Sequence, residues 1–534
     1  MDIKNLTPHG RGVRGLNLSR SSVLFEGAFG RIFRALPPAE FGVSDSETLA
    51  NLKVLGRAMV GTDDVSKDGP DDEESGIPAL YTYLGQFIDH DLTFDPASSL
   101  QQQNDADGLV DYRTPRFDLD NVYGRGPDDA PYLYEFGKGS NRAKFVLGKA
   151  LSGGGPLNQD ARDLPRNDAH LAPEQPARAI IGDPRNDENA LVSQLQGLFL
   201  RFHNRLVDDG MTFADAQRTL RFHYQWMLIH DFLPKLVNSA SLHAVFPHLG
   251  KRSSLAKDPP VLAFYHARDQ GFMPFEFSVA AYRFGHSMVR PGYRLNDNPE
   301  TLLPIFGQAG PPERPLSLRG FMAPADNWAL DWPRFIDIEA RPSGVLLDAN
   351  GKMPDGSSPT SEQLADNKRR LQLAYRIDTS IVFPLGKLPP DVADLIIPSL
   401  AERNLVRGWR LRLPSGQAVA RAMGARPLDQ VLIGKFLDRP ETTSIEQLHP
   451  VFKDNCPLWT YCLAETIHHT VVGHNGVQSR LLGDVGGRIV AETFAGILRY
   501  DSHSFLNQDP NWRPTIGEGH TFGLREFVRF ALGR

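Results

Sequence analysis

The segment from Tyr81 to Asp95, YTYLGQFIDHDLTFD, places four side chains that can do chemistry within six residues. They are Gln86, Asp89, His90 and Asp91. Gln86 and His90 are four residues apart and share one face of a predicted helix, whereas the two aspartates lie to either side of that face. One short helix could therefore serve two sites. A lone histidine on an apolar helix is more often a core residue with a satisfied hydrogen bond, so this segment does not decide the function by itself.

Two further polar clusters stand in apolar surroundings. Arg185 and Glu188 lie in DPRNDEN, just before a long apolar pattern, and His286 lies in AYRFGHSM with Arg283 three residues before it. The dipole of the following helix stabilises a negative charge at its start, which is the ordinary explanation of Glu188. Two separate helical histidines, His90 and His286, would also suit an iron porphyrin, with one imidazole as iron ligand and the other as acid and base.

Several other kinds of site are missing from the sequence. It contains no HExxH zinc motif, no GxSxG elbow and no phosphate-binding glycine loop, which argues against zinc hydrolases, esterases and nucleotide hydrolases. The cluster of His468, His469 and His474 is a weak alternative metal site, because no carboxylate accompanies it at a recognisable spacing. Cys456 and Cys462 are six residues apart in one predicted helix, so we expect buried thiols and a reducing compartment rather than a disulfide.

The elements that must position these clusters are helices, because apolar residues recur along them at three- and four-residue spacing. Besides 81–95, the longest patterns run from Glu188 to Asp208 and from Phe213 to Val237, and these two helices should pack as a pair. Further helices are expected at 275–290, 361–376, 390–403, 456–470, 485–498 and 523–532. No segment alternates in hydrophobicity for long, no period repeats and no change of composition divides the chain. We therefore predict a mainly α fold with little β structure: one large domain with long loops over residues 46–534, preceded by an arm of residues 1–45.

The composition is that of an ordinary globular protein, with 534 residues, 41% hydrophobic and 23% charged. The net charge of −6 gives no electrostatic reason to expect nucleic acid or an anionic membrane surface as a partner. No apolar run approaches the roughly 18 residues of a membrane span, and the N-terminus lacks the apolar core of a secretory signal. We expect a monomer without a membrane span, located in the cytoplasm or exported by a route other than Sec.

Five segments together resemble the animal-type haem peroxidases of the peroxidase–cyclooxygenase superfamily. They are GQFIDHDLTF, RTPRFDLDNVYG, DPRNDENALVSQLQGLFLRFHNRL, YRFGHSMVRP and NLVRGWRLRLPSGQ, in the order and spacing of that family over roughly residues 80–500. The missing secretory signal and the scarcity of cysteines resemble the bacterial members more than secreted mammalian ones such as myeloperoxidase.

The resemblance implies a mainly α peroxidase domain that holds haem b. His90 would be the distal histidine, Gln86 its companion in the pocket and Arg185 the distal arginine. His286 would ligate the haem iron, and Asn404 would accept a hydrogen bond from its imidazole, which fixes the tautomer. Spacing alone would not have named haem.

The resemblance also implies covalent haem and bound calcium. Carboxylates at the positions of Asp89 and Glu188 form esters with haem methyl groups in the family. Calcium would be bound by the side chains of Asp91, Thr114, Asp118 and Asp120 and the backbone oxygen of Arg116, all of them the hard oxygen ligands that this cation prefers. Three converging carboxylates without a cation would repel one another.

The implied activity is reduction of hydrogen peroxide coupled to oxidation of halides, thiocyanate or phenolic donors. Myeloperoxidase carries a methionine after its ester-forming glutamate, which bonds to the haem and makes it a stronger oxidant. The residue after Glu188 is Asn189, so we expect iodide, thiocyanate, bromide and phenols to be oxidised and chloride to be a poor substrate.

Two alternatives remain on the same fold. The first is a fatty-acid dioxygenase or cyclooxygenase, but these relatives carry a radical-forming tyrosine three residues before the proximal histidine, where this chain has Arg283. Tyr282 is displaced by one residue, about 100° around a helix. The second is a non-catalytic haem or calcium-binding module, which the presence of both His90 and Arg185 argues against. We expect Arg283 to lie against the cofactor.

Overall fold

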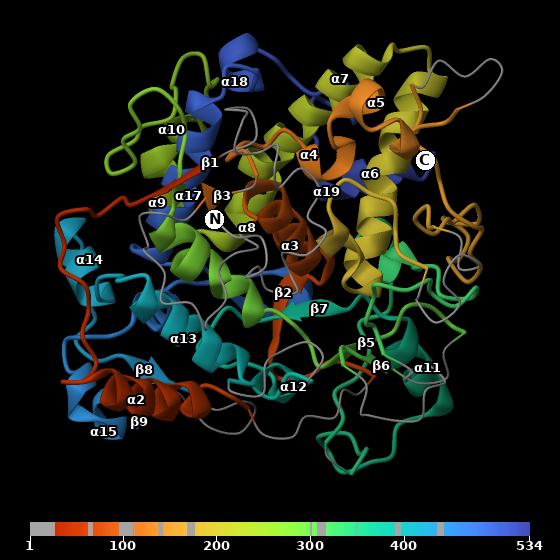
Figure 1. The fold of residues 1–534 in the computed structure, drawn as a ribbon. Helices are drawn as coiled ribbons and strands as arrows, with labels where there is room; N and C mark the ends of the chain where they lie inside the picture. Colours follow the sequence, from red (N-terminus) through yellow and green to blue (C-terminus); the bar gives the residue numbers. More distant parts are fainter. Residues whose placement is uncertain are drawn as a thin grey trace.

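Helices connected by long loops make up most of the regular structure (Figure 1). The computed structural model describes residues 27–61, 68–94, 110–111, 113–136, 143–167, 177–298, 302–306, 317–348, 350–389, 397–434 and 443–534. Strands in these ranges are two to five residues long. The predicted mainly α fold class is confirmed.

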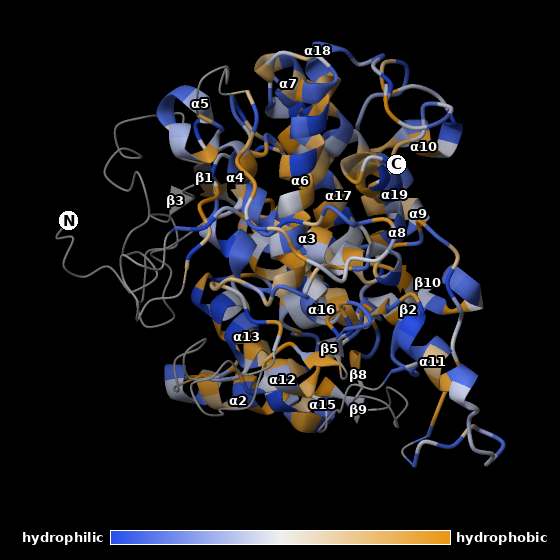
Figure 2. Ribbon diagram, turned by 90° about the vertical axis from the view of Figure 1, so that its right-hand side faces the viewer, coloured by the Kyte–Doolittle hydropathy of each residue, from blue (hydrophilic) through white to orange (hydrophobic). Residues whose placement is uncertain are grey.

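Helix α3, Leu80–Leu92, lies near the centre of the molecule in two perpendicular views (Figure 1, Figure 2). It packs on α6, Ala190–Asp208, where the rings of Phe87 and Phe199 stack with centroids 4.2 Å apart. Its buried first turn has no side-chain cap, and the backbone N–H of Leu80 donates instead to the carbonyl oxygen of Phe335 at 3.0 Å. Because packing surrounds it, α3 can hold its polar residues in fixed positions.

The second long pattern forms a helix with one irregular turn. α7, Phe213–Met227, packs on α6 as predicted and continues through a π-helical turn, η7, Leu228–Phe232, into the short α8, Leu233–Leu236. α19, Leu524–Ala531, covers another part of α6. The predicted pair is therefore the scaffold against which α3 rests.

The segment predicted as one α-helix over 275–290 is not α-helical. It consists of a π-helix, η8, Glu276–Ala280, and a 3₁₀-helix, η9, Ala281–His286, with a non-helical backbone at Ala280 (φ −126°, ψ −79°) between them. A 3₁₀-helix has three residues per turn, so Arg283 and His286 share one face. The segment is buried on most sides, and a sequence pattern without a continuous polar face does not reveal its period.

Other predicted helices differ at their ends. α11, Ser361–Arg369, stops before the strand β7, Leu373–Tyr375. α13, Leu400–Arg410, begins later than predicted, and residues 390–396 of that prediction lie outside the described ranges. α16, Leu458–Ala464, passes into the 3₁₀-helix η12, Glu465–His468. α17, Gly486–Tyr500, agrees closely with the predicted helix.

One long helix was not predicted. α2, Asp45–Ala58, is capped by Ser44, whose hydroxyl oxygen accepts a hydrogen bond from the N–H of Glu47 at 3.3 Å. The spacing of Ser44 and Glu47 is a capping signal that the sequence contains. The shorter α-helices are α4 Asp120–Tyr123, α5 Gly126–Asp129, α9 Ser239–Val245, α10 Pro247–Lys251, α12 Phe383–Gly386, α14 Gly416–Ala422, α15 Ile445–Leu448 and α18 Phe505–Gln508. Further 3₁₀-helices are η4 Pro131–Leu133, η6 Pro184–Asp187, η10 Trp332–Arg334, η11 Pro450–Phe452 and η13 His474–Gly476.

The strands form small separate sheets. β1, Gly27–Gly30, pairs antiparallel with β3, Val110–Asp111, and parallel with β4, Met273–Pro274. The two-stranded sheets pair β2 Glu74–Pro78 with β7, β5 Gly292–Tyr293 with β6 Leu303–Pro304, β8 Leu432–Ile433 with β9 Thr443–Ser444, and β10 Thr470–Val472 with β11 Gln478–Arg480.

Residues 1–26 of the predicted arm lie outside the described part of the chain. In the part that is described, Phe33 and Phe41 are buried. The division of the chain at residue 45 stays a prediction.

Cys456 and Cys462 are both free and buried, as expected, and burial raises the pKa of each thiol well above its ordinary value. Within the described ranges, no helix combines the length and the apolar character needed to cross a bilayer.

Candidate active site

His90 lies in the last turn of α3 and is almost completely buried. Its ring Nδ1 lies 2.7 Å from Oδ1 of Asn186, which belongs to the 3₁₀-helix η6. Arg185 Nη2 donates to the backbone oxygen of His90 at 3.0 Å. The structure therefore brings together the two residues that the sequence predicts as a distal pair.

Electrostatics keep the imidazole of His90 neutral. Burial, and then the charge of Arg185, lower its pKa to about 4 against the opposing charges of Asp183 and Asp89. Asp183 is fully buried and accepts hydrogen bonds from Arg185 Nη2 at 2.8 Å and Arg113 Nη2 at 2.6 Å. These two guanidinium groups hold the pKa of Asp183 well below its usual range despite burial, so its carboxylate stays charged and fixes Arg185.

Gln86 and Glu188 meet across the gap between α3 and the start of α6. Gln86 Nε2 donates to Glu188 Oε1, and Gln86 Oε1 accepts from Asn189 Nδ2 at 3.1 Å. α6 begins at Ala190, two residues later than predicted, so Glu188 lies directly before the N-cap Asn189 rather than inside the helix. Glu188 Oε1 is 3.8 Å from His90 Nε2. Burial raises the pKa of Glu188 to about 7, although 34% of the side chain remains exposed.

His286 is the last residue of η9 and comes from the opposite half of the sequence. Burial, and then the charge of Arg283, lower its pKa to about 3, so its imidazole is neutral at pH 7. Its Nδ1 lies 2.8 Å from Asn404 Nδ2 of α13. Among the described residues none makes a hydrogen bond with Nε2 of His286, and this nitrogen is available to a ligand.

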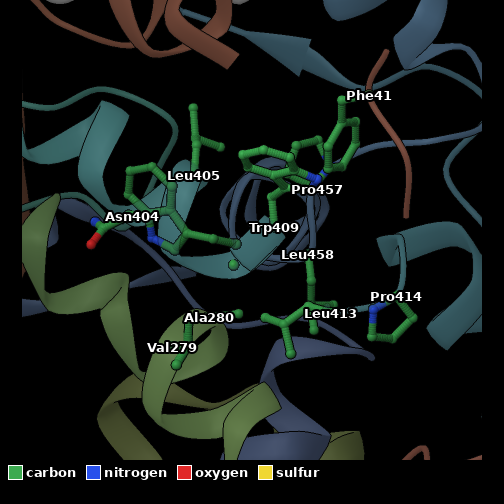
Figure 3. A pocket seen from close by; sticks show the side chains of 12 residues that line it. Phe41, Val279, Ala280, Asn404, Leu405, Trp409, Leu413, Pro414, Pro457 and Leu458 are labelled. Atoms are coloured by element: carbon green, nitrogen blue, oxygen red, sulfur yellow. The ribbon is translucent and has the colours of Figure 1, made fainter. Parts of the chain in front are cut away.

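Asn404 presents its amide nitrogen to His286, where the sequence analysis expected an acceptor. An iron-ligating imidazole must carry its proton on Nδ1, so it requires the amide oxygen at this place. Half a turn of the amide brings Oδ1 there, and no other hydrogen bond in the described part of the chain opposes the rotation. In Figure 3 the amide points away from the apolar hollow lined by Leu405 and Trp409 of the same helix.

Asp89 and Arg283 lie in the region of the two histidines. The carboxylate of Asp89 acts electrostatically on His90, Glu188 and His286 alike, which places it within reach of both clusters. Thr93 Oγ1 donates to its Oδ1 at 3.3 Å. Arg283 Nε donates to the carbonyl oxygen of Ser278 at 2.8 Å, within its own segment.

Three aspartates converge on the other side of α3. One carboxylate oxygen each from Asp91, Asp118 and Asp120 lie within 4.8 Å of one another. Both oxygens of Asp91 are buried, and within the described part of the chain neither has a hydrogen-bond partner, which is costly for a carboxylate unless a cation binds it. A left-handed backbone at Leu119 (φ 61°) turns Asp118 and Asp120 toward the same place.

The expected remaining ligands lie beside these aspartates. Thr114 Oγ1 donates to Asp118 Oδ2 at 2.9 Å, and Arg116 is in the same turn, with its N–H donating to the carbonyl oxygen of Thr114 at 2.7 Å. Burial and the charge of Asp120 raise the pKa of Asp118 to about 7. A set of oxygen ligands with unbalanced negative charge fits a hard divalent cation such as calcium.

Some contributing residues were not predicted. Asp183, two residues before Arg185, could have been noticed as a carboxylate at a proline turn. The sequence contains no pattern that points to Asn186, because its hydrogen-bond partner His90 is 96 residues away. Asp501, which follows α17, raises the pKa of Asp118 further and lies 4.0 Å from Arg116 Nε. Contacts over such separations are not visible in local sequence patterns.

Comparison with known proteins agrees with the resemblance. Residues 105–309 match the family model of the animal haem peroxidases. The peroxidasin homologue of Homo sapiens is 26% identical over 194 residues, which are 35% of this chain and 12% of that protein. The dual oxidase of Drosophila melanogaster is 31% identical over 129 residues, 24% of this chain and 8% of that protein. The match thus spans only a small part of these much longer relatives.

Solved structures share the fold. Peroxidase A from Dictyostelium discoideum superposes with a TM-score of 0.52 at 17% identity, over 91% of each chain. A fatty acid α-dioxygenase from Arabidopsis thaliana gives a TM-score of 0.52 at 14% identity, over 92% of this chain and 74% of that one. At these identities the likeness to the solved structures shows a shared fold. Over residues 105–309 the chain is similar to the animal haem peroxidases.

Proposed function

We propose that this protein is a haem peroxidase that reduces hydrogen peroxide and oxidises small anionic or phenolic donors. The observation that carries the proposal is the pair of buried, neutral histidines with different surroundings. His90 lies beside a fixed arginine, Arg185. The ring of His286 has one nitrogen against Asn404, and the other has no hydrogen-bond partner among the residues that the structure describes. The first arrangement suits proton transfer, and the second suits ligation of a metal.

The residues present fit a haem group. His286 would hold the iron through Nε2, with Asn404 turned to accept the Nδ1 proton. Asp89 and Glu188, whose carboxylates lie in the region of His90, would hold the haem edge through ester bonds. When bound, haem supplies the two-electron redox chemistry that peroxide reduction requires.

His90 is the proposed acid–base residue. Its neutral Nε2 takes the proton of hydrogen peroxide and gives it back to the oxygen atom that leaves as water. Arg185 compensates the negative charge that develops between these steps. Its Nε and Nη2 are engaged with Asp183 and His90, whereas Nη1 makes no hydrogen bond within the described ranges and can donate to the substrate. Gln86, one turn before His90 on α3, is the hydrogen-bond donor to Glu188 beside it.

The choice of donor depends on how strong an oxidant the haem becomes. Asn189 cannot form the sulfonium bond that a methionine forms at this position, and its side chain is already used at both ends, as a cap of α6 and as a donor to Gln86. We therefore propose iodide, thiocyanate, bromide and phenols as donors and expect chloride to be poor. Steady-state assays with hydrogen peroxide and each anion at neutral pH test this, and equal turnover of chloride and bromide would contradict it.

A fatty-acid dioxygenase on the same fold is the second candidate, and two observations disfavour it. Arg283 stands three residues before His286, where a radical-forming tyrosine would be needed. The hydroxyl of Tyr282, one residue earlier, donates to the carbonyl oxygen of Gly85 at 3.2 Å. The hydroxyl of Tyr282 is thus already engaged in a backbone hydrogen bond, and Tyr282 stands one position away from the place that the dioxygenase pattern requires.

The decisive experiment is the absorption spectrum of the purified protein before and after hydrogen peroxide. We expect a haem Soret band that changes on addition of peroxide. His90→Ala should keep the band and lose the rapid change, whereas His286→Ala should lose the band. His203→Ala, at a buried histidine that bonds to Tyr123 instead, is the matched control and should keep both. A wild-type protein without a haem band would overturn the proposal.

A further inference from the structure

Asn186 and Gln196 form a buried chain of side chains behind His90. Oδ1 of Asn186 lies 2.7 Å from Nδ1 of His90, and Nδ2 of Asn186 donates to Oε1 of Gln196 at 2.9 Å. Asn186 and Gln196 are both fully buried. Gln196 stands on α6, the helix against which α3 packs, so the chain connects the histidine to a rigid part of the fold.

This chain fixes which nitrogen of His90 carries the proton. The amide nitrogen of Asn186 is used as a donor to Gln196, so the amide oxygen is the atom that faces the imidazole. An oxygen can only accept there, and Nδ1 must donate. In a neutral imidazole the other nitrogen, Nε2, is then left with its lone pair. The geometry selects the tautomer in which His90 is a base on the side of Glu188.

We infer that Asn186, held by Gln196, is a positioning residue that keeps His90 in its proton-accepting tautomer. The inference rests on the proposed peroxidase function. It adds the reason why Nε2 of His90 is the basic nitrogen. When Nε2 takes a proton from the substrate, the Nδ1 proton stays in its hydrogen bond with Asn186, and the proton on Nε2 is the one returned. Without an acceptor behind the ring, the tautomer protonated at Nε2 becomes available, and its Nε2 cannot accept a proton from the substrate.

The test uses the haem-loaded protein and three variants. Asn186→Leu removes the acceptor at nearly constant volume, and Asn186→Asp keeps an acceptor oxygen. Asn296→Leu is the matched control, because Asn296 is equally buried and donates to the backbone oxygens of Asn327 and Ala329. All three should retain the Soret band, and Asn186→Leu and Asn296→Leu should lose thermal stability to a similar degree.

The first measurement is the rate of cyanide binding, followed by the Soret shift. Hydrogen cyanide must give its proton to a base before its anion binds, so this rate reports on Nε2 without turnover. We expect Asn186→Leu to slow both cyanide binding and the reaction with peroxide at least about tenfold at pH 7, and Asn296→Leu to change neither. Equal rates for wild type and Asn186→Leu would overturn the inference.

The second measurement is the tautomer itself, from the ¹⁵N shifts of histidine-labelled protein in the diamagnetic carbonmonoxy form, with His90 assigned from a His90→Gln variant. We expect Nδ1 to be protonated in wild type and Asn186→Asp and deprotonated in Asn186→Leu. Nδ1 protonated in all three would overturn the inference. A wild-type protein without haem or without peroxide reactivity would instead contradict the proposed function.

Discussion

Asn189 shows how much a single side chain does at this site. Its side-chain oxygen accepts hydrogen bonds from the N–H groups of Leu191 and Val192 at the start of α6. Its side-chain nitrogen donates to Gln86, and Gln86 in turn donates to Glu188. A residue that is both helix cap and pocket support cannot be exchanged for methionine without loss. The position that we propose to limit the oxidising power of the haem is therefore also one that stabilises the fold.

We predict that Asn189→Ala lowers the free energy of unfolding by about 1 kcal/mol, the usual cost of a lost cap. Asn189→Ser keeps a capping oxygen and should recover most of that loss, but it cannot donate to Gln86. Urea denaturation of the wild type and the two variants gives the free energy that the cap contributes to folding. The rate of the reaction with peroxide shows what the hydrogen bond from Asn189 to Gln86 contributes to activity. A serine variant as unstable as the alanine variant would show that the cap does not matter.

We predict that the haem is covalently attached through Asp89 and Glu188. Wild-type protein treated with peroxide should retain its haem in acidified organic solvent, whereas the double variant Asp89→Asn, Glu188→Gln should release it, because an amide does not form the ester. Glu188→Gln also preserves the size of the side chain beside Gln86. Complete release of haem from the wild type would refute the linkage.

At the residue scale, the sequence predicts what lies inside continuous motifs. His90, Arg185 and His286 could be named because each stands in a recognisable segment. Asn186 and Asp183 could not be assigned a role, because their roles arise from contacts that the fold creates. The orientation of the Asn404 amide is also invisible in the sequence, since it depends on hydrogen bonding alone.

At the element scale, α3 links the two sites. His90 and Asp91 are consecutive in it, so the cation cluster lies directly behind the distal histidine. The turn at Leu119 brings Asp118 and Asp120 to the helix. The charges of Arg113 and Arg185 offset only part of their mutual repulsion, because both guanidinium groups are also paired with Asp183. A cation at this cluster would fix the end of α3 that carries the imidazole.

We predict that Asp118→Ala has opposite effects with and without calcium. In calcium, the wild type should melt at a higher temperature than the variant and retain haem better, because the ion binds the folded state. In excess chelator the variant should be at least as stable as the wild type, because it lacks one of the repelling carboxylates. Asp129→Ala, at an exposed carboxylate in α5, should behave as wild type in both conditions. Calcium-independent melting of the wild type would rule the site out.

Helix prediction succeeded where large apolar residues recur at three- and four-residue spacing over several turns. This spacing is clear in α6, α7 and α17, although α6 and α17 are buried nearly all round, and their predicted bounds were close. The 276–286 segment is buried on most sides, and its π and 3₁₀ turns are set by packing rather than by propensity. α2 was missed although Ser44 and Glu47 mark its start.

At the scale of the whole molecule, burial of neutral histidines makes stability depend on pH. Burial lowers the pKa of His203 and of His223 to about 4, and both lie outside the two proposed sites. The unfolded chain binds protons near pH 6.5, before the folded chain does. Folding is therefore favoured most above pH 6.5, and stability is lost as the pH falls from there toward 4.

We predict that the melting temperature falls steadily between pH 7 and pH 5, with each of these histidines contributing on the order of 1–2 kcal/mol at pH 5. His203→Gln should be less stable than the wild type at pH 7. Its melting temperature should fall less on acidification, because one titrating group has been removed. Scanning calorimetry at several pH values checks this. Parallel pH profiles of wild type and variant would contradict the assignment.

The contact between His286 and Asn404 spans 118 residues, and it sets an order of events during synthesis. A chain emerging from the ribosome carries the whole distal cluster long before residue 404 is available to the proximal imidazole. With His286 as the proposed haem ligand, its imidazole lacks its partner Asn404 until more than three quarters of the protein has been made. We therefore predict that haem is captured late in biogenesis, and a translation arrest before residue 404 should yield chains that do not retain haem.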